Sequence, residues 1–138
     1  MLINRNYIKM CDKAKQLQRA WKPKDWDRFI YRDSEEMDIM MYMEEEYNRK
    51  EMIIVNGVYI WLPTQEQLQE IWRKEYLKNP NQHGWFGCFV NFVDTDYRDD
   101  LIADEYFGEM NELWLAFVMR ERWNKFWTGE KWVKEVIK

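Results

Sequence analysis

The chain has 138 residues, of which 46% are hydrophobic, 33% charged and 17% aromatic, and its net charge is −4. This is the size and composition of one globular domain, which we expect to span 1–138, with an aromatic fraction well above ordinary usage. Two cysteines are too few for a disulfide framework or a four-ligand zinc site, and no apolar segment follows Met1. The longest apolar run, 113–119, is too short to cross a membrane. We therefore expect a cytoplasmic protein with reduced thiols and no membrane segment.

The first predicted element is an amphipathic helix. Apolar residues recur at spacings of three and four between Tyr7 and Trp21, and polar residues fill the positions between them. The helix should end near Lys22, because Pro23 disfavours helical dihedral angles in the residue before it. The segment 25–31 that follows is rich in aromatic and branched side chains, which predicts a strand.

The middle of the chain predicts a hairpin and a second helix. Residues 34–50 are acidic and rich in methionine, and they fit neither helical nor strand periodicity, so we expect at most part of a strand there. Asn56 and Gly57 join two apolar runs and are the favoured pair for a two-residue hairpin turn. Thr64 begins a capping-box pattern, which predicts a helix from there to about residue 79.

The last third predicts a strand followed by a long helix. The patch WFGCFVNFV, residues 85–93, is apolar and is broken by glycine, which favours a short strand. The helix should start near Asp104, because acidic residues lie toward its N-terminus and basic residues toward its C-terminus. Gly129 is the expected stop, and Trp114 and Phe117 should face the core.

These elements together predict an α+β fold. A small antiparallel sheet, which contains the tight Asn56-Gly57 hairpin, should pack against two or three amphipathic helices. Charge alternates strongly along the chain: residues 1–32 carry nine Lys/Arg and three Asp/Glu, whereas 33–51 carry two and eight and 91–112 carry one and eight. The amino-terminal part is therefore the basic region that a polyanion would contact.

Aromatic side chains near the carboxyl end are the first candidate for a binding surface. Trp123, Phe126, Trp127 and Trp132 lie beyond the part of the helix that faces the core, and they exceed what one side of a small core usually holds. They predict either packing onto the amino-terminal helix or a contact with an unknown protein partner or a second copy, because aromatic residues are enriched in interface cores.

A basic segment near the amino end is the second candidate. Trp21, Lys22, Lys24 and Trp26 interleave cations with aromatic rings, which suits phosphate contact and base stacking. The net negative charge of the chain argues against broad non-specific binding to nucleic acid. The alternative interpretation is a solvated surface on which lysine stems cover apolar side chains.

Residues for catalysis or metal binding are scarce. His83 is the only histidine, and although Cys88 follows nearby, a strand would point the two side chains to opposite faces, which is unsuitable for a nucleophile and its base. The acidic segment 94–105 resembles a calcium loop, but Arg98 stands where a ligand belongs and Asp99 where the loop needs glycine. We therefore predict no catalytic residue, no metal site and no cofactor.

Three segments together resemble small uncharacterised proteins encoded in phages and prophages of Gram-positive bacteria. They are WKPKDWDRFIYRD (21–33), IWLPTQEQLQEIW (60–72) and LWLAFVMRERWNKFWTGEKWV (113–133). The resemblance implies a phage or prophage origin and a bacterial host cell, and it implies no activity. We predict a non-enzymatic accessory protein that acts as a protein-interaction module; the alternative is a nucleic-acid-binding protein that uses the basic amino-terminal patch.

Overall fold

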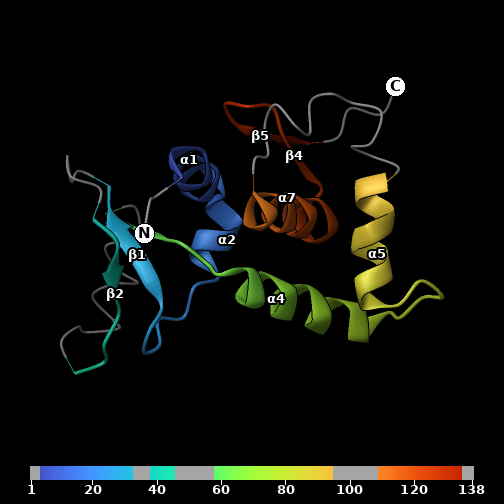
Figure 1. The fold of residues 1–138 in the computed structure, drawn as a ribbon, viewed down its shortest axis with the longest axis horizontal. Coiled ribbons are helices and arrows are strands. Elements are labelled where there is room, and N and C mark those ends of the chain that lie inside the picture. The colour runs from blue at the N-terminus through green and yellow to red at the C-terminus, as the bar shows by residue number, and fades with distance from the viewer. Residues whose placement is uncertain (1–3, 33–37, 46–57, 95–108, 135–138) are drawn as a thin grey trace. The chain divides into compact units, whose positions relative to one another are not determined.

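The structure, a computed structural model, describes residues 4–32, 38–45, 58–94 and 109–134. They belong to two compact units, one within residues 1–64 and one within 65–138 (Figure 1). The elements are α1 Arg5–Lys13, α2 Lys15–Arg19, β1 Arg28–Tyr31, β2 Met40–Met41, β3 Tyr59–Trp61, α4 Gln65–Lys78, α5 Trp85–Phe92, α7 Met110–Trp123, β4 Lys125–Trp127 and β5 Trp132–Lys134. Helices and small antiparallel sheets confirm the predicted α+β class; a single domain over 1–138 stays a prediction.

The amino-terminal helix is divided in two, where the periodicity predicted one continuous helix. Asn4 caps α1, since its side-chain oxygen accepts hydrogen bonds from the backbone N–H groups of Asn6 and Tyr7, at 2.9 and 3.3 Å. Ala14, with ψ of 72°, interrupts the helical backbone before α2 begins. The apolar periodicity survives this break, because Met10, Ala14 and Leu17 are all buried.

The sheet of the first unit has the strand order β2-β1-β3, and both pairings are antiparallel. Strand β1 confirms the strand predicted over 25–31, and β2 is a short strand within the acidic segment 34–50. Phe29 lies opposite Trp61 and Tyr31 opposite Tyr59. The bonds from Leu62 N–H to the Arg28 carbonyl and from Arg32 N–H to the Val58 carbonyl, both 2.8 Å, close the two ends of this β1–β3 ladder. The predicted Asn56-Gly57 turn lies outside the described residues.

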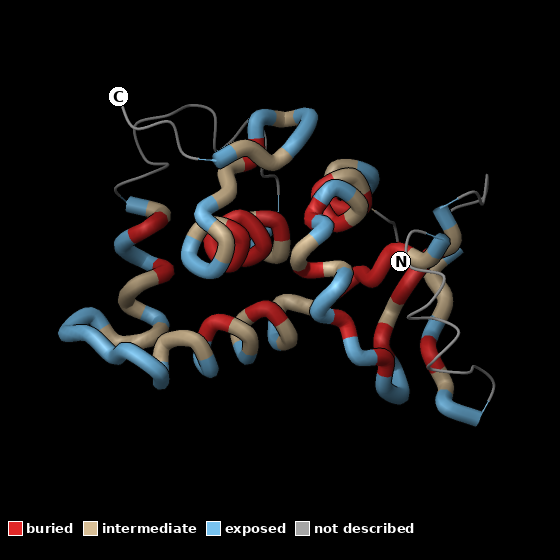
Figure 2. Tube along the Cα trace, turned by 180° about the vertical axis from the view of Figure 1, so that it is seen from behind, coloured by how far each residue is buried: buried red, intermediate tan, exposed pale blue. Residues whose placement is uncertain are grey.

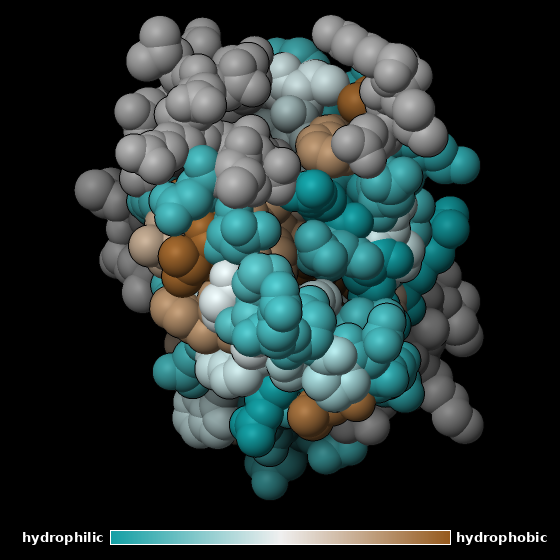
Figure 3. Space-filling model, turned by 90° about the vertical axis from the view of Figure 1, so that its right-hand side faces the viewer, coloured by the Kyte–Doolittle hydropathy of each residue, from teal (hydrophilic) through white to brown (hydrophobic). Residues whose placement is uncertain are grey.

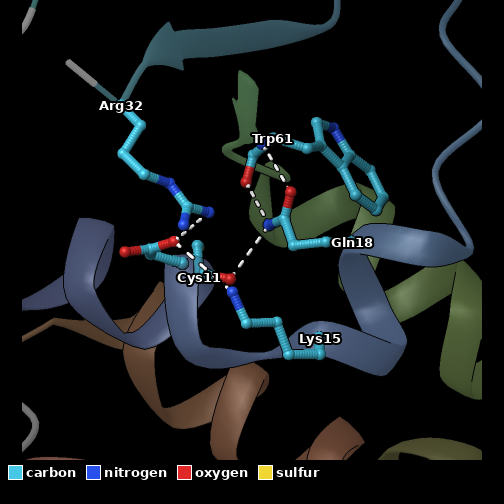
Figure 4. A network of polar contacts seen from close by, with 6 residues as sticks. Cys11, Lys15, Gln18, Arg32 and Trp61 are labelled. Atoms are coloured by element: carbon cyan, nitrogen blue, oxygen red, sulfur yellow. Dashed lines mark hydrogen bonds and ion pairs between the residues drawn. The ribbon is translucent and has the colours of Figure 1, made fainter. Parts of the chain in front are cut away.

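A glutamine side chain occupies the open edge of β3 (Figure 4). Because hydrogen-bonded and non-hydrogen-bonded pairs alternate in antiparallel strands, the N–H and C=O of Trp61 point away from β1. Gln18 meets both: its Oε1 accepts from Trp61 N–H at 2.8 Å, and its Nε2 donates to the Trp61 carbonyl at 3.0 Å. The same Nε2 donates to the Cys11 carbonyl at 3.0 Å, just before the helix break. One amide thus connects α1, α2 and β3.

Aromatic rings cover one face of this sheet. The rings of Trp21 and Trp61 are stacked, with centroids 6.0 Å apart and planes 5° from parallel, and Trp21 also contacts Phe29. The indole N–H of Trp21 donates to the buried carboxylate of Asp27 at 2.9 Å. Buried positions run through the helices and strands of the first unit (Figure 2), and Trp21, Asp27, Phe29 and Trp61 are all buried. Trp21 is therefore a core residue of the first unit.

The core of the second unit is built from three helices, α4, α5 and α7. Helix α4 begins at the residue after Thr64 and ends before Asn79, which confirms the predicted boundaries. Residues 114–119 of α7 are all buried, which confirms Trp114 and Phe117 as core residues. The Trp114 ring stacks on Phe89 with centroids 3.9 Å apart and planes 3° from parallel.

The apolar patch at 85–92 is a helix, and the predicted strand is wrong. Helix α5 starts after Gly84, whose φ of 76° favours glycine over any residue with a side chain. The packing partner decides the conformation: Phe89 is buried against Trp114, and Trp72 Nε1 donates to the carbonyl of Trp85 at 2.6 Å. Short apolar runs of this kind fit either a strand or a buried helix by periodicity alone.

The last helix is shorter than predicted. It ends at Trp123, not near Gly129, because Asn124 adopts the left-handed conformation with φ of 53° and ψ of 46°. Strands β4 and β5 follow as a hairpin, in which Lys125 faces Lys134, Phe126 faces Val133 and Trp127 faces Trp132. Thr128 holds the turn, since its Oγ1 accepts from the N–H groups of Glu130 and Lys131 at 3.3 and 3.2 Å. The predicted start near Asp104 lies outside the described residues.

Candidate interaction surfaces

Helix α5 carries apolar side chains in its buried face and in the exposed surface next to that face. Phe89 and Phe92 are buried in the second unit, whereas the Phe86 and Val90 side chains are exposed at 51% and 43%. Phe86 and Val90 are four residues apart, so they lie on one ridge of the helix. The space-filling view from the side of α5 shows apolar surface among hydrophilic side chains (Figure 3). No residue of α5 carries a formal charge.

The exposed Phe86 ring is anchored by the core beneath it. Its centroid lies 5.8 Å from that of Trp85, 6.1 Å from that of Phe89 and 6.2 Å from that of Trp114. These ring contacts restrict the motion of Phe86 while leaving about half of its surface in water. A partner that packs on Phe86 therefore orders a side chain that has little freedom left to lose.

The four predicted aromatic residues at the carboxyl end do not share one face. Trp127 is only 4% exposed and packs against Trp132, with ring centroids 5.1 Å apart. Phe126 precedes Trp127 in β4, so its side chain points to the other face of the hairpin. Trp123 lies at the end of α7, where the guanidinium of Arg122 covers its ring at 4.9 Å from the centroid.

A cation further covers this aromatic group. The guanidinium of Arg120 lies 5.3 Å from the ring centroid of Phe92 and 5.6 Å from that of Phe126. Cation–π contacts of this kind hold α5, α7 and β4 together within the second unit. Trp123, Phe126 and Trp132 are half-buried, and Trp127 is buried. The contacts of these four side chains are therefore mainly within the unit, and their role as a partner surface stays a prediction.

Glu121, next to Arg120, gives the second unit a pH dependence. Burial raises the pKa of Glu121 above its ordinary value of 4.5, and the nearby charge of Arg120 partly lowers it. A raised folded-state pKa stabilises the fold below the unfolded-state pKa, and this stabilisation is lost as the pH rises through the folded-state pKa.

We therefore expect Glu121→Gln to unfold at a higher temperature than the wild type at neutral pH and at the same temperature in acid. The effect is small, since the side chain reaches solvent. Thermal unfolding across a pH series measures it. Glu70→Gln, an exposed position on α4, controls for the loss of one negative charge. A wild-type advantage at neutral pH would contradict the expected sign.

Trp26 is the most exposed large apolar residue in the described part of the chain, at 68%. It occupies the third position of the turn 24–27, which the bond from Asp27 N–H to the Lys24 carbonyl closes at 3.1 Å. Its φ of 76° is the value that this position of a type II turn requires and that glycine adopts most easily. A bulky side chain at such a φ is strained.

The neighbouring strand explains why the turn has this conformation. Trp26 N–H donates to the carbonyl of Tyr42 at 2.9 Å, and Tyr42 N–H donates to the carbonyl of Asp27 at 2.7 Å. Two residues thus face one, which is the geometry of a β-bulge whose first residue is usually a left-handed glycine. The buried carboxylate of Asp27 also accepts from Lys24 N–H at 3.1 Å and so fixes the turn.

We expect Trp26→Gly to be more stable than Trp26→Ala by about 1 kcal/mol, because a left-handed residue with a Cβ costs about 1–2 kcal/mol and the greater unfolded-state freedom of glycine offsets part of the relief. Urea unfolding of the two variants, followed by far-UV circular dichroism, gives the difference. If Trp26→Ala is at least as stable as Trp26→Gly, the turn is not strained.

The basic candidate residues near this turn have different environments. Lys22 and Lys24 are exposed, and among the described residues neither forms an ion pair. Trp21 is buried, so it is not available to stack on a base. Asp25 lies between Lys24 and Trp26, and its Oδ1 accepts from the N–H of Glu44 at 2.8 Å. The positive potential at the lysines is therefore reduced by the carboxylates beside them.

His83 and Cys88 lie near a shared asparagine. The side-chain oxygen of Asn81 accepts from the backbone N–H of His83 at 2.9 Å, and the thiol of Cys88 lies 3.5 Å from the same oxygen. Cys88 is on α5, so the argument from strand geometry does not apply. No group of three His, Cys, Asp or Glu side chains that could hold a metal ion is found within the described ranges. Most of the acidic segment 94–105 lies outside them.

Comparison with protein-family models, with curated proteins and with solved structures finds no match. Within the described residues, no helix is long and apolar enough to cross a membrane.

Sequence reasoning missed the exposed ridge of α5. The spacing of Phe86 and Val90 indicates a helical ridge only if the segment is a helix, and the strand interpretation places them on the same face of a sheet. The available signal was the lack of charged residues over Trp85–Phe92. A helix without a charged face is normally shielded from water by other parts of the protein or by a partner.

Proposed function

We propose that the protein is a non-enzymatic protein-interaction module and that the exposed ridge of α5 is its binding surface. The observation that carries this proposal is an uncharged helix that buries Phe89 and Phe92 and exposes Phe86 and Val90 beside them. Exposed apolar side chains that continue a buried face are typical of a surface that a partner covers. A protein partner would supply the missing cover.

The chemistry of the ridge favours a protein over a charged ligand. Phe86 and Val90 offer only apolar contact, and the ring of the half-buried Trp85 lies beside that of Phe86, with centroids 5.8 Å apart. Aromatic residues held by their own packing are typical centres of protein interfaces. The proposed setting, based on the sequence resemblance, is the cytoplasm of a bacterial cell that carries a phage or prophage.

A pull-down of the tagged full chain from a Gram-positive lysate tests this function. The wild type should retain a protein in the presence of nuclease, and Val90→Lys should lose it, because the new charge must be desolvated in an apolar contact. Val58→Lys is a matched control: Val58 is a valine of similar exposure, at 38%, in the other unit. It should retain the partner.

The variants are first checked for folding. Val90 is exposed, so Val90→Lys should unfold at nearly the wild-type temperature. Equal capture by Val90→Lys and the wild type, or no capture by the wild type, would refute the α5 surface. If nuclease removes every captured protein, the result supports the alternative, nucleic-acid binding through Lys22, Lys24 and Trp26.

A further inference from the structure

We propose that the turn at Trp26 is a self-association surface, through which two copies of this chain make a symmetric contact. This surface belongs to the first unit and is independent of the α5 ridge. The contact would place Trp26 at its centre and the charged residues Lys22, Lys24, Asp25 and Glu45 around it.

The first argument is that Trp26 has no structural reason to be tryptophan. Its side chain is mostly in water, and its backbone conformation favours glycine. Strained residues that persist in a fold are found disproportionately at functional sites. Tryptophan is also the residue most enriched among those that dominate binding energy in protein interfaces. The turn therefore presents a binding side chain at a conformational cost.

The second argument is that both signs of charge flank the ring. Lys22 and Lys24 are exposed on the chain leading into the turn. Asp25 is also exposed, and its bond to Glu44 N–H brings the segment 42–45, with the exposed Glu45, to the same turn. Within the described residues, no ion pair joins these lysines to these carboxylates. The charges are therefore available to a partner.

A second copy fits such a surface better than a polyanion does. In a contact with twofold symmetry the same patch meets itself, so the lysines of one copy can face the carboxylates of the other while the two indoles pack together. A nucleic acid would satisfy the lysines but would meet Asp25 and Glu45 with like charge. The contact is small compared with stable dimers, so association should depend strongly on concentration.

Sedimentation velocity over a concentration series tests the proposal on the full chain. The wild type should shift from monomer toward dimer as concentration rises, and added salt should weaken the shift because the charges are at the exposed rim. Trp26→Gly should weaken dimerisation at least about tenfold while the fold is retained. Val90→Lys, on the α5 ridge, should dimerise like the wild type.

Charge reversal decides whether the contact is symmetric. The double variant Lys22→Glu, Lys24→Glu and the double variant Asp25→Lys, Glu45→Lys should each be monomeric, and an equimolar mixture of the two should form dimers. A wild type that stays monomeric at all concentrations would overturn the proposal. So would dimers that persist in Trp26→Gly, or reversals that leave dimerisation unchanged. A monomer that binds a labelled single-stranded oligonucleotide through the two lysines would also overturn it, in favour of nucleic acid.

Discussion

Trp114→Ala should lower the free energy of unfolding of the second unit by about 3–5 kcal/mol, the range for removing a buried large aromatic side chain. Trp114 is fully buried in α7 and stacks on Phe89, and its ring also contacts those of Trp85, Phe86 and Phe117. The substitution removes the ring that joins α7 to α5 and leaves a cavity that the surrounding rings cannot fill. Urea unfolding followed by near-UV circular dichroism measures the loss.

The matched control is Trp26→Ala, which removes the same side chain from an exposed turn. Its free energy of unfolding should change by no more than about 0.5 kcal/mol. Trp114→Phe should recover a part of the lost stability, because a smaller ring can still stack on Phe89. A Trp114→Ala variant as stable as Trp26→Ala would show that the aromatic cluster does not stabilise the second unit.

Gln18→Ala should destabilise the first unit by about 3 kcal/mol, because buried polar groups left without a partner cost about 1–3 kcal/mol each. The substitution removes the side-chain partner of both the N–H and the carbonyl of Trp61. It also removes one of two donors to the Cys11 carbonyl, which still accepts from Ala14 N–H at 3.1 Å. Both residues are buried, so water replaces the lost bonds poorly. Urea unfolding followed by the circular dichroism of the stacked indoles Trp21 and Trp61 reports on this unit.

Two variants separate the hydrogen bonds from the volume of the side chain. Gln18→Glu keeps the size and one acceptor, but it presents a carboxylate oxygen to two carbonyl oxygens, so it should also destabilise the unit. Gln16→Ala removes the same side chain from the same helix, at a position whose side chain has no hydrogen bond among the described residues, and should have little effect. Equal losses in Gln16→Ala and Gln18→Ala would contradict the role of the amide.

Local signals in the sequence were enough for the elements whose ends they mark. Thr64 with its capping-box pattern located the start of α4, and the aromatic and branched residues before Tyr31 located β1. The α+β class followed from these elements. The core positions Trp114 and Phe117 followed from helical spacing, because a helix presents residues three and four apart on one face.

Sequence patterns predicted the wrong secondary structure where a contact with a residue distant in the chain decides the conformation. Helix α5 has the composition of a strand, and only its contact with α7 and α4 makes the helix the better solution. The end of α7 depends on Asn124, a residue that tolerates left-handed dihedral angles but does not demand them. After Asn124, the segments KFW (125–127) and WVK (132–134) are separated by a short turn, which is a pattern typical of a hairpin. The charge order of the preceding helix led us to extend the helix over this segment instead.

The candidate surfaces were the hardest part to predict. Aromatic content alone could not separate Trp127, which is buried, from Trp26, which is exposed, since charged residues lie within two positions of each. The positive φ of Trp26 results from bonds to Tyr42, which lies far along the chain. Exposure is a property of the assembled unit, and so the useful binding residues became visible only with its packing.

The amide of Gln18 has a further consequence for the behaviour of the chain in solution. The free edge of a sheet is a template on which a strand from another molecule can add, and proteins commonly protect such edges against aggregation. Gln18 holds both the N–H and the carbonyl of Trp61, so an incoming strand must displace it before it can pair there. The Gln18 side chain thus protects the edge of β3 against pairing with another molecule. Variants without it should unfold more easily, and they should also aggregate from the native state.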